Sequence, residues 1–144
     1  MEELERARYY TRLLRRSINR IKALSSEGLK PYGISSGQYM ALLWISSHEG
    51  LIQEDLVLEL DSDPNTVSAI LRQLDKKKWI ERRRHPTDGR AIALFATKQG
   101  KELLGVIKPR MDRAISLIVA LLPAGHEAAI ADWLEQLAQV RELP

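Results

Sequence analysis

The chain has 144 residues and no cysteine, and its 22 lysines and arginines against 19 acidic residues give a formal net charge of +3. This length suits one domain with a core of its own, and a chain without thiols excludes cysteine nucleophiles, disulfides, thiol-based redox sensing and cysteine zinc sites. Because charged residues interrupt every apolar stretch and the first residues form no apolar signal core, we expect no membrane span and a cytoplasmic location.

The charge is unevenly distributed along the chain. Residues 1–30 hold eight basic and four acidic residues, residues 31–63 hold six acidic residues and no basic one, and residues 64–90 hold eight basic and three acidic residues. A local basic excess of this kind attracts polyanions. A solvated charged surface is the alternative interpretation of the same pattern.

The first segment predicts one long amphipathic helix. Apolar residues recur every three or four positions from Leu4 to Leu24, and Gly28 and Pro31 are expected to end the helix. A second helix is expected to follow Ser35 or Ser36, since serine is a preferred N-cap.

Two further helices joined by a short turn predict a helix-turn-helix unit. The first covers about residues 53–60, and Asp61-Ser62-Asp63 forms the turn. Asp63 is a suitable N-cap for the second, and Pro64 suits its first position because no amide donor is needed there. This helix is expected to run to about Lys77.

The periodicity then changes to that of strands. Residues 79–84 and 90–96 predict a β-hairpin, with the turn-forming residues 85–89 at its tip. Thr97 is a candidate cap for a long helix that starts at Lys98, and a last helix carries Trp133 among its apolar residues. The order of elements predicts a mainly α (α+β) fold, a winged helix-turn-helix with long N- and C-terminal helices.

The second helix of the helix-turn-helix has a polar face suited to reading DNA. Asparagine and glutamine pair with adenine, arginine pairs with guanine, and serine and threonine bind bases or phosphates, while small residues allow close approach. The candidate DNA-binding residues of this helix are Asn65, Thr66, Ser68, Ala69, Arg72 and Gln73. An ordinary amphipathic helix with a solvated face is the alternative.

The hairpin carries arginines around its tip. A protruding ribbon of this kind suits a minor groove, whose narrow A·T tracts attract guanidinium groups. Asp88 is expected to orient Arg90 or a neighbouring arginine through a carboxylate–guanidinium pair. The candidate DNA-binding residues of the hairpin are Arg82, Arg84, Asp88 and Arg90. A solvated basic hairpin is the alternative.

The sequence has no recognisable catalytic or metal-binding constellation. Its three histidines are far apart, and the adjacent carboxylates of Glu54 and Asp55 diverge on a helix. We therefore expect no enzymatic activity, no cofactor and no metal. A winged-helix adaptor for protein–protein assembly is the alternative to a DNA-binding regulator, although an adaptor has no need of so many arginines in its hairpin.

A series of short motifs resembles the MarR family of winged-helix transcriptional regulators. In chain order the similar stretches are Ile34-Ser35-Ser36-Gly37-Gln38-Tyr39, Gln53-Glu54-Asp55-Leu56, Asn65-Thr66-Val67-Ser68, Leu74-Asp75-Lys76-Lys77, Ile80-Glu81-Arg82, Asp88-Gly89-Arg90 and Thr97-Lys98-Gln99-Gly100. Three positions depart from the family pattern. Ala69 stands where the family often has arginine, and Asp61 and Lys78 replace glycines of a turn and a helix end. Lys78 is expected to take a left-handed conformation or to change how the helix ends.

The resemblance implies a sequence-specific regulator of transcription, expected to be a repressor, that binds a pseudo-palindromic double-stranded DNA operator as a homodimer. It implies one domain over residues 1–144, with a DNA-binding lobe at 34–97 and dimerisation helices at 1–30 and 100–144. It also implies a cleft for a small aromatic or anionic effector. The candidate residues of this cleft are Tyr9, Tyr10, Arg12, Arg16, Tyr39 and Trp44. Packing in the core and at interfaces is the alternative role for these six residues.

Overall fold

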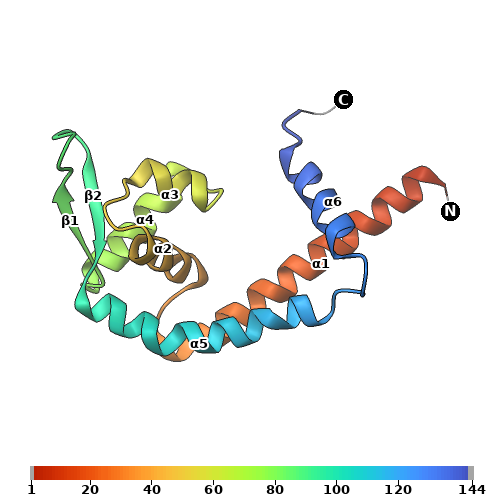
Figure 1. Ribbon diagram of the computed structural model, residues 1–144, viewed down its shortest axis with the longest axis horizontal. Helices are drawn as coiled ribbons and strands as arrows, with labels where there is room; N and C mark the ends of the chain where they lie inside the picture. Colours follow the sequence, from red (N-terminus) through yellow and green to blue (C-terminus); the bar gives the residue numbers. More distant parts are fainter. Residues whose placement is uncertain (1, 143–144) are drawn as a thin grey trace.

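The computed structural model describes residues 2–142, which form a winged-helix lobe and a set of longer helices. The lobe contains α2 (Ser36–Ser47), α3 (Gln53–Glu59), α4 (Pro64–Lys76), β1 (Ile80–Arg84) and β2 (Ile92–Ala96). The other elements are α1 (Glu3–Leu29), the short 3-10 helix η1 (Lys30–Tyr32), α5 (Lys98–Ala120) and α6 (Glu127–Gln139). Figure 1 shows the lobe at one end of an elongated molecule, with α6 and both termini at the other end. This order of elements is the predicted one.

Helix α1 contributes little to the core of the protomer. Leu29 is its one buried residue, and Tyr10 and Ile18 of its apolar stripe are 48% and 50% exposed. The helix continues through Gly28, where the sequence predicted a stop, because a glycine in an exposed last turn costs too little to end a helix. Pro31 lies in η1, after which the chain turns at Gly33 with a φ of 66°.

Local hydrogen bonds set where α2 and α4 begin. Ser35 accepts a hydrogen bond from the amide of Gln38 (3.1 Å), and the Gln38 side chain accepts one from the Ser35 amide (3.4 Å). Asp63 caps α4 by accepting from the amide of Thr66 (2.8 Å), with Pro64 at the first helical position. These are the predicted caps, and each satisfies an amide that would otherwise lack a partner.

Two residues that stand in for glycines hold left-handed backbone conformations. Asp61 has a φ of 46° in the turn before α4, and Lys78 has a φ of 60° two residues after its last residue, Lys76. The Lys78 amide donates to the carbonyl of Asp75 (2.9 Å), which closes the end of the helix. One of the two alternatives predicted for Lys78 is therefore confirmed.

The strands β1 and β2 and the turn of residues 85–91 form the wing. The strands are antiparallel, with Ile80 opposite Ala96 at the base and Arg84 opposite Ile92 near the tip. Ile80 and Ala96 are buried in the lobe, whereas Arg84 and Ile92 are exposed. The base of the wing is thus fixed by packing, and its tip projects from the lobe (Figure 1).

The apolar core lies within the lobe and beneath the first half of α5. Every buried side chain of the described residues is apolar. The residues with no exposed surface are Leu29, Ala41, Leu42, Ile45, Leu56, Val67, Leu71, Leu74, Ala93 and Ile107. Because they come from the helices and the wing alike, the core fixes α4 and the wing relative to each other.

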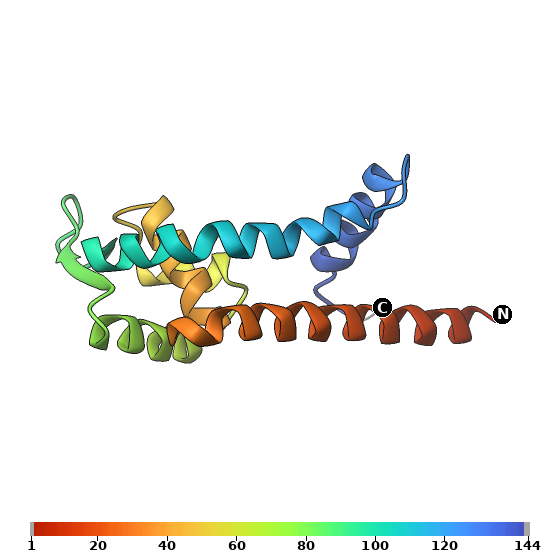
Figure 2. The same ribbon diagram turned by 90° about the horizontal axis from the view of Figure 1, so that it is seen from below.

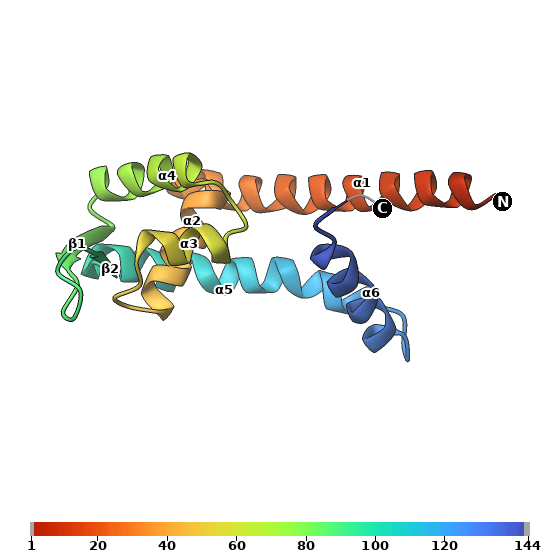
Figure 3. The same ribbon diagram turned by 90° about the horizontal axis from the view of Figure 1, so that it is seen from above.

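Helix α5 leaves the core halfway along its length. Thr97 caps it, as predicted, by accepting from the amide of Gly100 (3.1 Å), and the helix continues through Pro109. Met111 is its last buried residue, and α6 has none. Figures 2 and 3 show α1 and α5 leaving the lobe as two separate rods, which the lobe does not cover. The exposed apolar residues beyond Met111 are Ile115, Leu117, Ile118, Val119, Leu121, Trp133, Leu134, Leu137 and Val140.

Gly100→Ala is expected to destabilise the lobe, because a Cβ at this position would overlap the backbone carbonyl oxygen of Trp79 and crowd Leu42 at 3.3 Å. Overpacking of this kind costs about 1–3 kcal/mol, which corresponds to a fall in Tm of roughly 3–10 °C. Gly105→Ala is the matched control, since nothing lies within 4 Å of its added Cβ. Its Tm should hold or rise, so equal Tm values for the two variants would contradict this packing.

Candidate nucleic-acid interface

Helix α4 presents one side to the core and the other to solvent. Val67, Leu71 and Leu74 are fully buried, so the helix cannot rotate without exposing apolar surface. The exposed candidate residues on the opposite side are Asn65, Thr66, Ala69, Arg72 and Gln73. Lys76, which the sequence analysis did not include, is also exposed and extends this set by one turn.

Thr66 is engaged in the cap of α4. Asp63 accepts a hydrogen bond from its amide (2.8 Å) and another from its hydroxyl (2.7 Å). The hydroxyl proton is therefore committed within the helix, and the Thr66 oxygen keeps only an acceptor function toward DNA. Thr66 fixes the start of α4 in addition to any contact with a base.

Ser68 differs from the other candidate residues of α4 because it faces α3. Its hydroxyl oxygen accepts a hydrogen bond from Gln53 Nε2 (2.7 Å), and both residues are half-buried. Ser68 thus holds the two helices of the helix-turn-helix together. Sequence reasoning had no signal for this bond, since nothing local reports which α4 residue meets Gln53.

The cap of α4 gives a pH-dependent prediction. The hydrogen bond from the Thr66 side chain, followed by that from its amide, lowers the pKa of Asp63 below its usual value of 3.8. A lowered pKa in the folded state contributes stability that is complete above the unfolded pKa and is lost as the pH falls through the folded pKa. Below about pH 4 the parent should lose this contribution, whereas Asp63→Asn, which caps without titrating, should not.

Thermal unfolding of both proteins between pH 3 and pH 7 checks this. We expect the difference in Tm between parent and Asp63→Asn to be largest at pH 7 and to shrink below about pH 4. A constant difference over the whole range would contradict an ionised cap.

Two of the three consecutive arginines of β1 have partners within the lobe. Arg82 Nε lies 3.7 Å from the carboxylate of Asp75 near the end of α4. Arg83 pairs with Glu81, and its guanidinium carbon lies 4.4 Å from the centre of the Phe95 ring. Arg82 therefore links the wing to α4, which the sequence analysis did not foresee.

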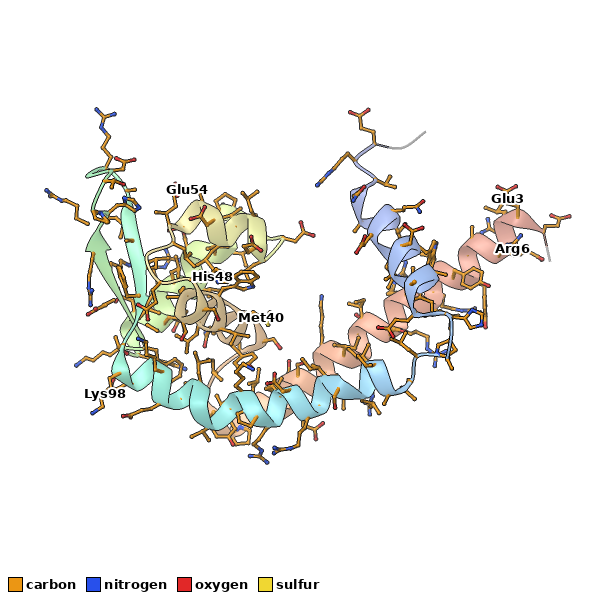
Figure 4. All side chains as sticks on the ribbon, in the orientation of Figure 1. Glu3, Arg6, Met40, His48, Glu54 and Lys98 are labelled. Atoms are coloured by element: carbon orange, nitrogen blue, oxygen red, sulfur yellow. The ribbon has the colours of Figure 1, made fainter. Side chains whose placement is uncertain are left out.

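Arg84 and Arg90 are the wing arginines that stay available for an outside ligand. Both are exposed, and the described residues contain no acidic group within ion-pair distance of either guanidinium. Figure 4 shows side chains reaching outward from the tip of the wing, on the same side of the molecule as Glu54 of α3. Two free guanidinium groups on a projecting ribbon can bind phosphates or enter a narrow groove.

Asp88 shapes the backbone of the wing tip. Its Oδ1 accepts a hydrogen bond from the Arg90 amide (3.0 Å), and its carbonyl oxygen accepts one from the Ala91 amide (3.1 Å). This differs from the predicted carboxylate–guanidinium pair, because a separation of two residues in a tight turn brings the amide within reach instead. Asp88 therefore fixes the position of Arg90 through the main chain.

A cavity of about 370 Å³, the wing cavity, lies between the wing and the start of α3. It holds two basic and two acidic side chains. Its lining residues are Ile52, Gln53, Glu54, Arg82, Asp88, Arg90, Ala91, Ile92 and Leu94. The cavity brings Arg90, Asp88 and Gln53 together from distant parts of the chain.

The candidate effector residues of α1 lie at the far end of the molecule or along the helix. The rings of Tyr9 and Tyr10 are 5.5 Å apart, and Tyr10 packs edge-on against Trp133 of α6 at 6.2 Å. The Arg12 guanidinium lies 5.7 Å from the centre of the Tyr9 ring. Arg16 lies further along α1, at the groove described below.

Tyr39 and Trp44 occupy two other places. Tyr39 is buried in the core, where burial and then the nearby Asp112 carboxylate raise its pKa. Trp44 is half-buried against the core and stacks on His48, which lies just after α2 (Figure 4), with 4.5 Å between ring centres. Within one protomer, therefore, the six candidate residues do not line a single cleft.

A larger groove of about 940 Å³, the α1–α5 groove, separates α1 from the second half of α5. Its walls are mostly apolar, with Arg16 and Arg20 as the charged residues. The lining residues are Leu13, Arg16, Ser17, Asn19, Arg20, Ile21, Ala23, Leu24, Ser25, Ala114, Ile115, Leu117, Ile118, Leu121 and Leu122. It is continuous with the exposed apolar surface of α5.

Residues 2–142 contain no cluster of three or more histidine or acidic side chains arranged to hold a metal ion. Over the same residues, no helix combines the length and the apolar character that a membrane crossing requires.

The chain is similar to known regulators of transcription. Residues 32–91 match the model of a family described as the MarR family. The regulator BilQ of Clostridioides difficile is 32% identical over 80 residues, which are 56% of this chain and 54% of BilQ, so the match spans about half of that relative. The transcriptional repressor MprA of Escherichia coli is 28% identical over 131 residues, which are 90% of this chain and 72% of MprA. Both relatives are named as regulators, in agreement with the prediction that the chain is not an enzyme.

Solved structures share the fold over nearly the whole chain. The complex of Staphylococcus aureus MepR with DNA has a TM-score of 0.83 and 25% identity, and the match covers 92% of this chain and 96% of MepR. CouR from Rhodococcus jostii, solved with bound p-coumaroyl-CoA, has a TM-score of 0.79 and 22% identity, with 92% and 93% of the two chains covered. These likenesses confirm the predicted winged-helix fold with its long flanking helices.

Proposed function

We propose that this chain is a DNA-binding transcriptional regulator of the MarR family and that it represses transcription by binding a pseudo-palindromic operator as a homodimer. The name of the relative MprA supports repression, and the DNA complex of MepR supports the use of the same lobe for DNA. An operator-binding protein of this kind acts in the cytoplasm, which is where we propose that it works.

One observation carries the proposal: an exposed polar row on α4 lies beside a wing whose tip arginines are free. Asn65, Arg72 and Gln73 have the groups that read bases in a major groove, and Arg84 and Arg90 have the groups that bind phosphates or a minor groove. The Arg82–Asp75 pair holds these two surfaces together. A protein–protein adaptor has no use for the free arginines, so the DNA-binding function is the better supported one.

We propose that a second copy of the chain covers the α1–α5 groove and the exposed face of α6. Large apolar areas on one protomer mark an interaction surface, and here they follow both terminal helical regions. The proposed dimerisation regions are therefore residues 1–30 and 100–144, and the lobe of residues 34–97 is left free for DNA. A two-fold dimer then presents two α4 helices to half-sites about one helical turn apart.

The second part of the proposal is release by a small aromatic or anionic effector. The likeness to CouR, which holds an aromatic and anionic ligand, supports this. Since Arg16 and Trp44 are apart within one protomer, we propose that the partner subunit completes the effector site. An effector that favours another spacing of the α4 helices would shift the population away from the DNA-bound state. Calorimetric titration with small aromatic acids tests this, and absence of any binding counts against it.

Selection from a random pool of duplex DNA tests the operator proposal. We expect the bound fraction to become enriched in one sequence with two inverted half-sites whose centres are about 10 base pairs apart. Enrichment of a single unrepeated site would contradict binding as a two-fold dimer.

Substitutions on α4 should change which sequence is preferred. Asn65→Ala and Arg72→Ala each remove a side chain able to make a bidentate contact with a base, so discrimination at one position of each half-site should fall by about 1–3 kcal/mol. Binding to unrelated DNA should change far less, because phosphate contacts dominate it. Repeating the selection with each variant checks this, and the control is Ser47→Ala, an exposed residue at the end of α2. An unchanged consensus for both variants would contradict the assignment of α4.

A further inference from the structure

The wing tip contains a histidine whose ring accepts hydrogen bonds from the turn itself. His85 Nδ1 lies 3.1 Å from the amide nitrogen of Asp88 and 3.3 Å from that of Thr87, and both amides donate to it. The Thr87 hydroxyl lies 3.2 Å from the same atom. The ring therefore has the role that an asparagine or serine side chain usually has in capping a turn.

These bonds belong to a set of hydrogen bonds that links the residues of the wing tip to one another. The His85 amide donates to the Ala91 carbonyl (3.0 Å), and the Ala91 amide donates to the Asp88 carbonyl (3.1 Å). Asp88 in turn accepts from the Arg90 amide (3.0 Å). The His85 ring completes this set by accepting from the Asp88 amide. It therefore holds the residue that fixes the main chain of Arg90.

We propose that neutral His85, with its ring proton on Nε2, is a positioning residue that holds the wing turn and thereby aims Arg90 at DNA. This rests on the proposed use of the wing in DNA binding. His85 itself need not touch DNA for this role. From the sequence, residue 85 was expected only to lie in the turn at the hairpin tip, without a role for its ring.

The role depends on the protonation state of the ring. Nδ1 has one lone pair and accepts only while it carries no proton, and histidine side chains gain a second proton between about pH 5 and pH 8. The charged groups around the turn are Arg82, Arg84, Asp88 and Arg90 of the wing, and Glu54 of α3, which lines the wing cavity with Arg82, Asp88 and Arg90. A proton on Nδ1 therefore removes the acceptor that holds the turn, and the Arg90 main chain loses its anchor.

Two variants separate this role from other uses of the ring. His85→Ala removes the acceptor. His85→Asn keeps one, because the oxygen of an asparagine side chain reaches the amides two and three residues ahead and does not titrate. Both variants should fold with the Tm of the parent, since the turn lies outside the apolar core.

The first arm uses NMR on the dimer without DNA. In the parent at pH 7.5 we expect the Nε2-protonated form of the ring and an ordered backbone at Gly89 and Arg90. At the pH at which the spectra show the ring to carry both protons, these two residues should become mobile in the parent but not in His85→Asn, and they should be mobile throughout in His85→Ala. An Nδ1-protonated ring, or a wing equally ordered in His85→Ala, overturns the proposal.

The second arm measures what Arg90 contributes to DNA affinity in each background, as the ratio of Kd with and without Arg90→Ala. At pH 7.5 we expect about 30-fold in the parent and in His85→Asn, and less than about 5-fold in His85→Ala. At the pH at which the ring carries both protons, the parent should approach the His85→Ala value while His85→Asn keeps its own. Equal ratios in the parent and His85→Ala overturn the proposal. A ratio of one in the parent contradicts the wing part of the proposed function instead, and the NMR arm still decides the role of His85.

Discussion

Arg90→Ala is expected to weaken DNA binding by about 30-fold at physiological salt, since roughly 1 kcal/mol is lost at each of two wings. Arg90 is exposed, its main chain is held by Asp88, and its guanidinium is free to bind a phosphate or enter a minor groove. Because such contacts act on any sequence, specific and non-specific affinity should fall alike. The slope of log K against log salt should also decrease by about two, close to one for each subunit.

Fluorescence anisotropy across a salt series measures both quantities. Arg6→Ala is the matched control, because it removes the same charge at the end of α1 farthest from the wing (Figure 4). The control should keep the affinity and slope of the parent. Equal affinity of Arg90→Ala and the parent at physiological salt would remove the wing from the interface.

Ile118→Glu is expected to convert the dimer into monomers and to lower operator affinity by at least about 100-fold. Ile118 is 46% exposed in the protomer and lines the α1–α5 groove, where we propose that the second copy packs. An unpaired carboxylate buried in an apolar interface costs several kcal/mol. A monomer holds one α4 helix and one wing, so it loses the gain from engaging two half-sites at once.

Light scattering measures the mass of Ile118→Glu in solution, and fluorescence anisotropy measures its affinity for the operator. Val106→Glu is the control, because Val106 is on the same helix and 56% exposed but does not line the groove. The control should stay dimeric with nearly the affinity of the parent. If Ile118→Glu also stays dimeric, the groove is not the dimer interface.

The starts of the helices could be predicted from the sequence because they depend on neighbours in the chain. Ser35, Asp63 and Thr97 each accept from an amide three residues ahead, so the residue types alone indicate the caps. The left-handed conformation of Lys78 was one of two alternatives that the sequence left open, and it turns the chain from α4 toward β1. The winged-helix order followed from these local signals together.

The roles of several site residues could not be predicted because they depend on contacts between distant segments. Ser68 was expected to face DNA, but Gln53 binds it from another helix. Arg82 was expected to bind DNA, but it lies beside Asp75 of α4. In both cases the residue type is compatible with DNA binding, and only the packing of the lobe shows that the side chain already has a partner.

The relative positions of the candidate effector residues could not be predicted either, because they depend on how separate helices pack. Tyr10 and Trp44 have suitable chemistry, yet they lie on different elements, because Tyr10 packs against Trp133 of α6 and Trp44 stacks on His48 at the end of α2. A helical period places residues on a face but does not place one helix against another. The His85 acceptor was missed for a related reason, since a histidine ring is not a usual cap.

Titration of the purified protein against the DNA upstream of its own gene, with a scrambled duplex as control, tests the central claim most directly. Anisotropy across a salt series should give saturable binding that is about a thousandfold or more tighter than to the control, with a steep salt slope. Equal and weak binding to the upstream and scrambled duplexes, together with equally weak binding to the sequences recovered by selection, would contradict a sequence-specific regulator. The basic wing would then bind a partner other than DNA.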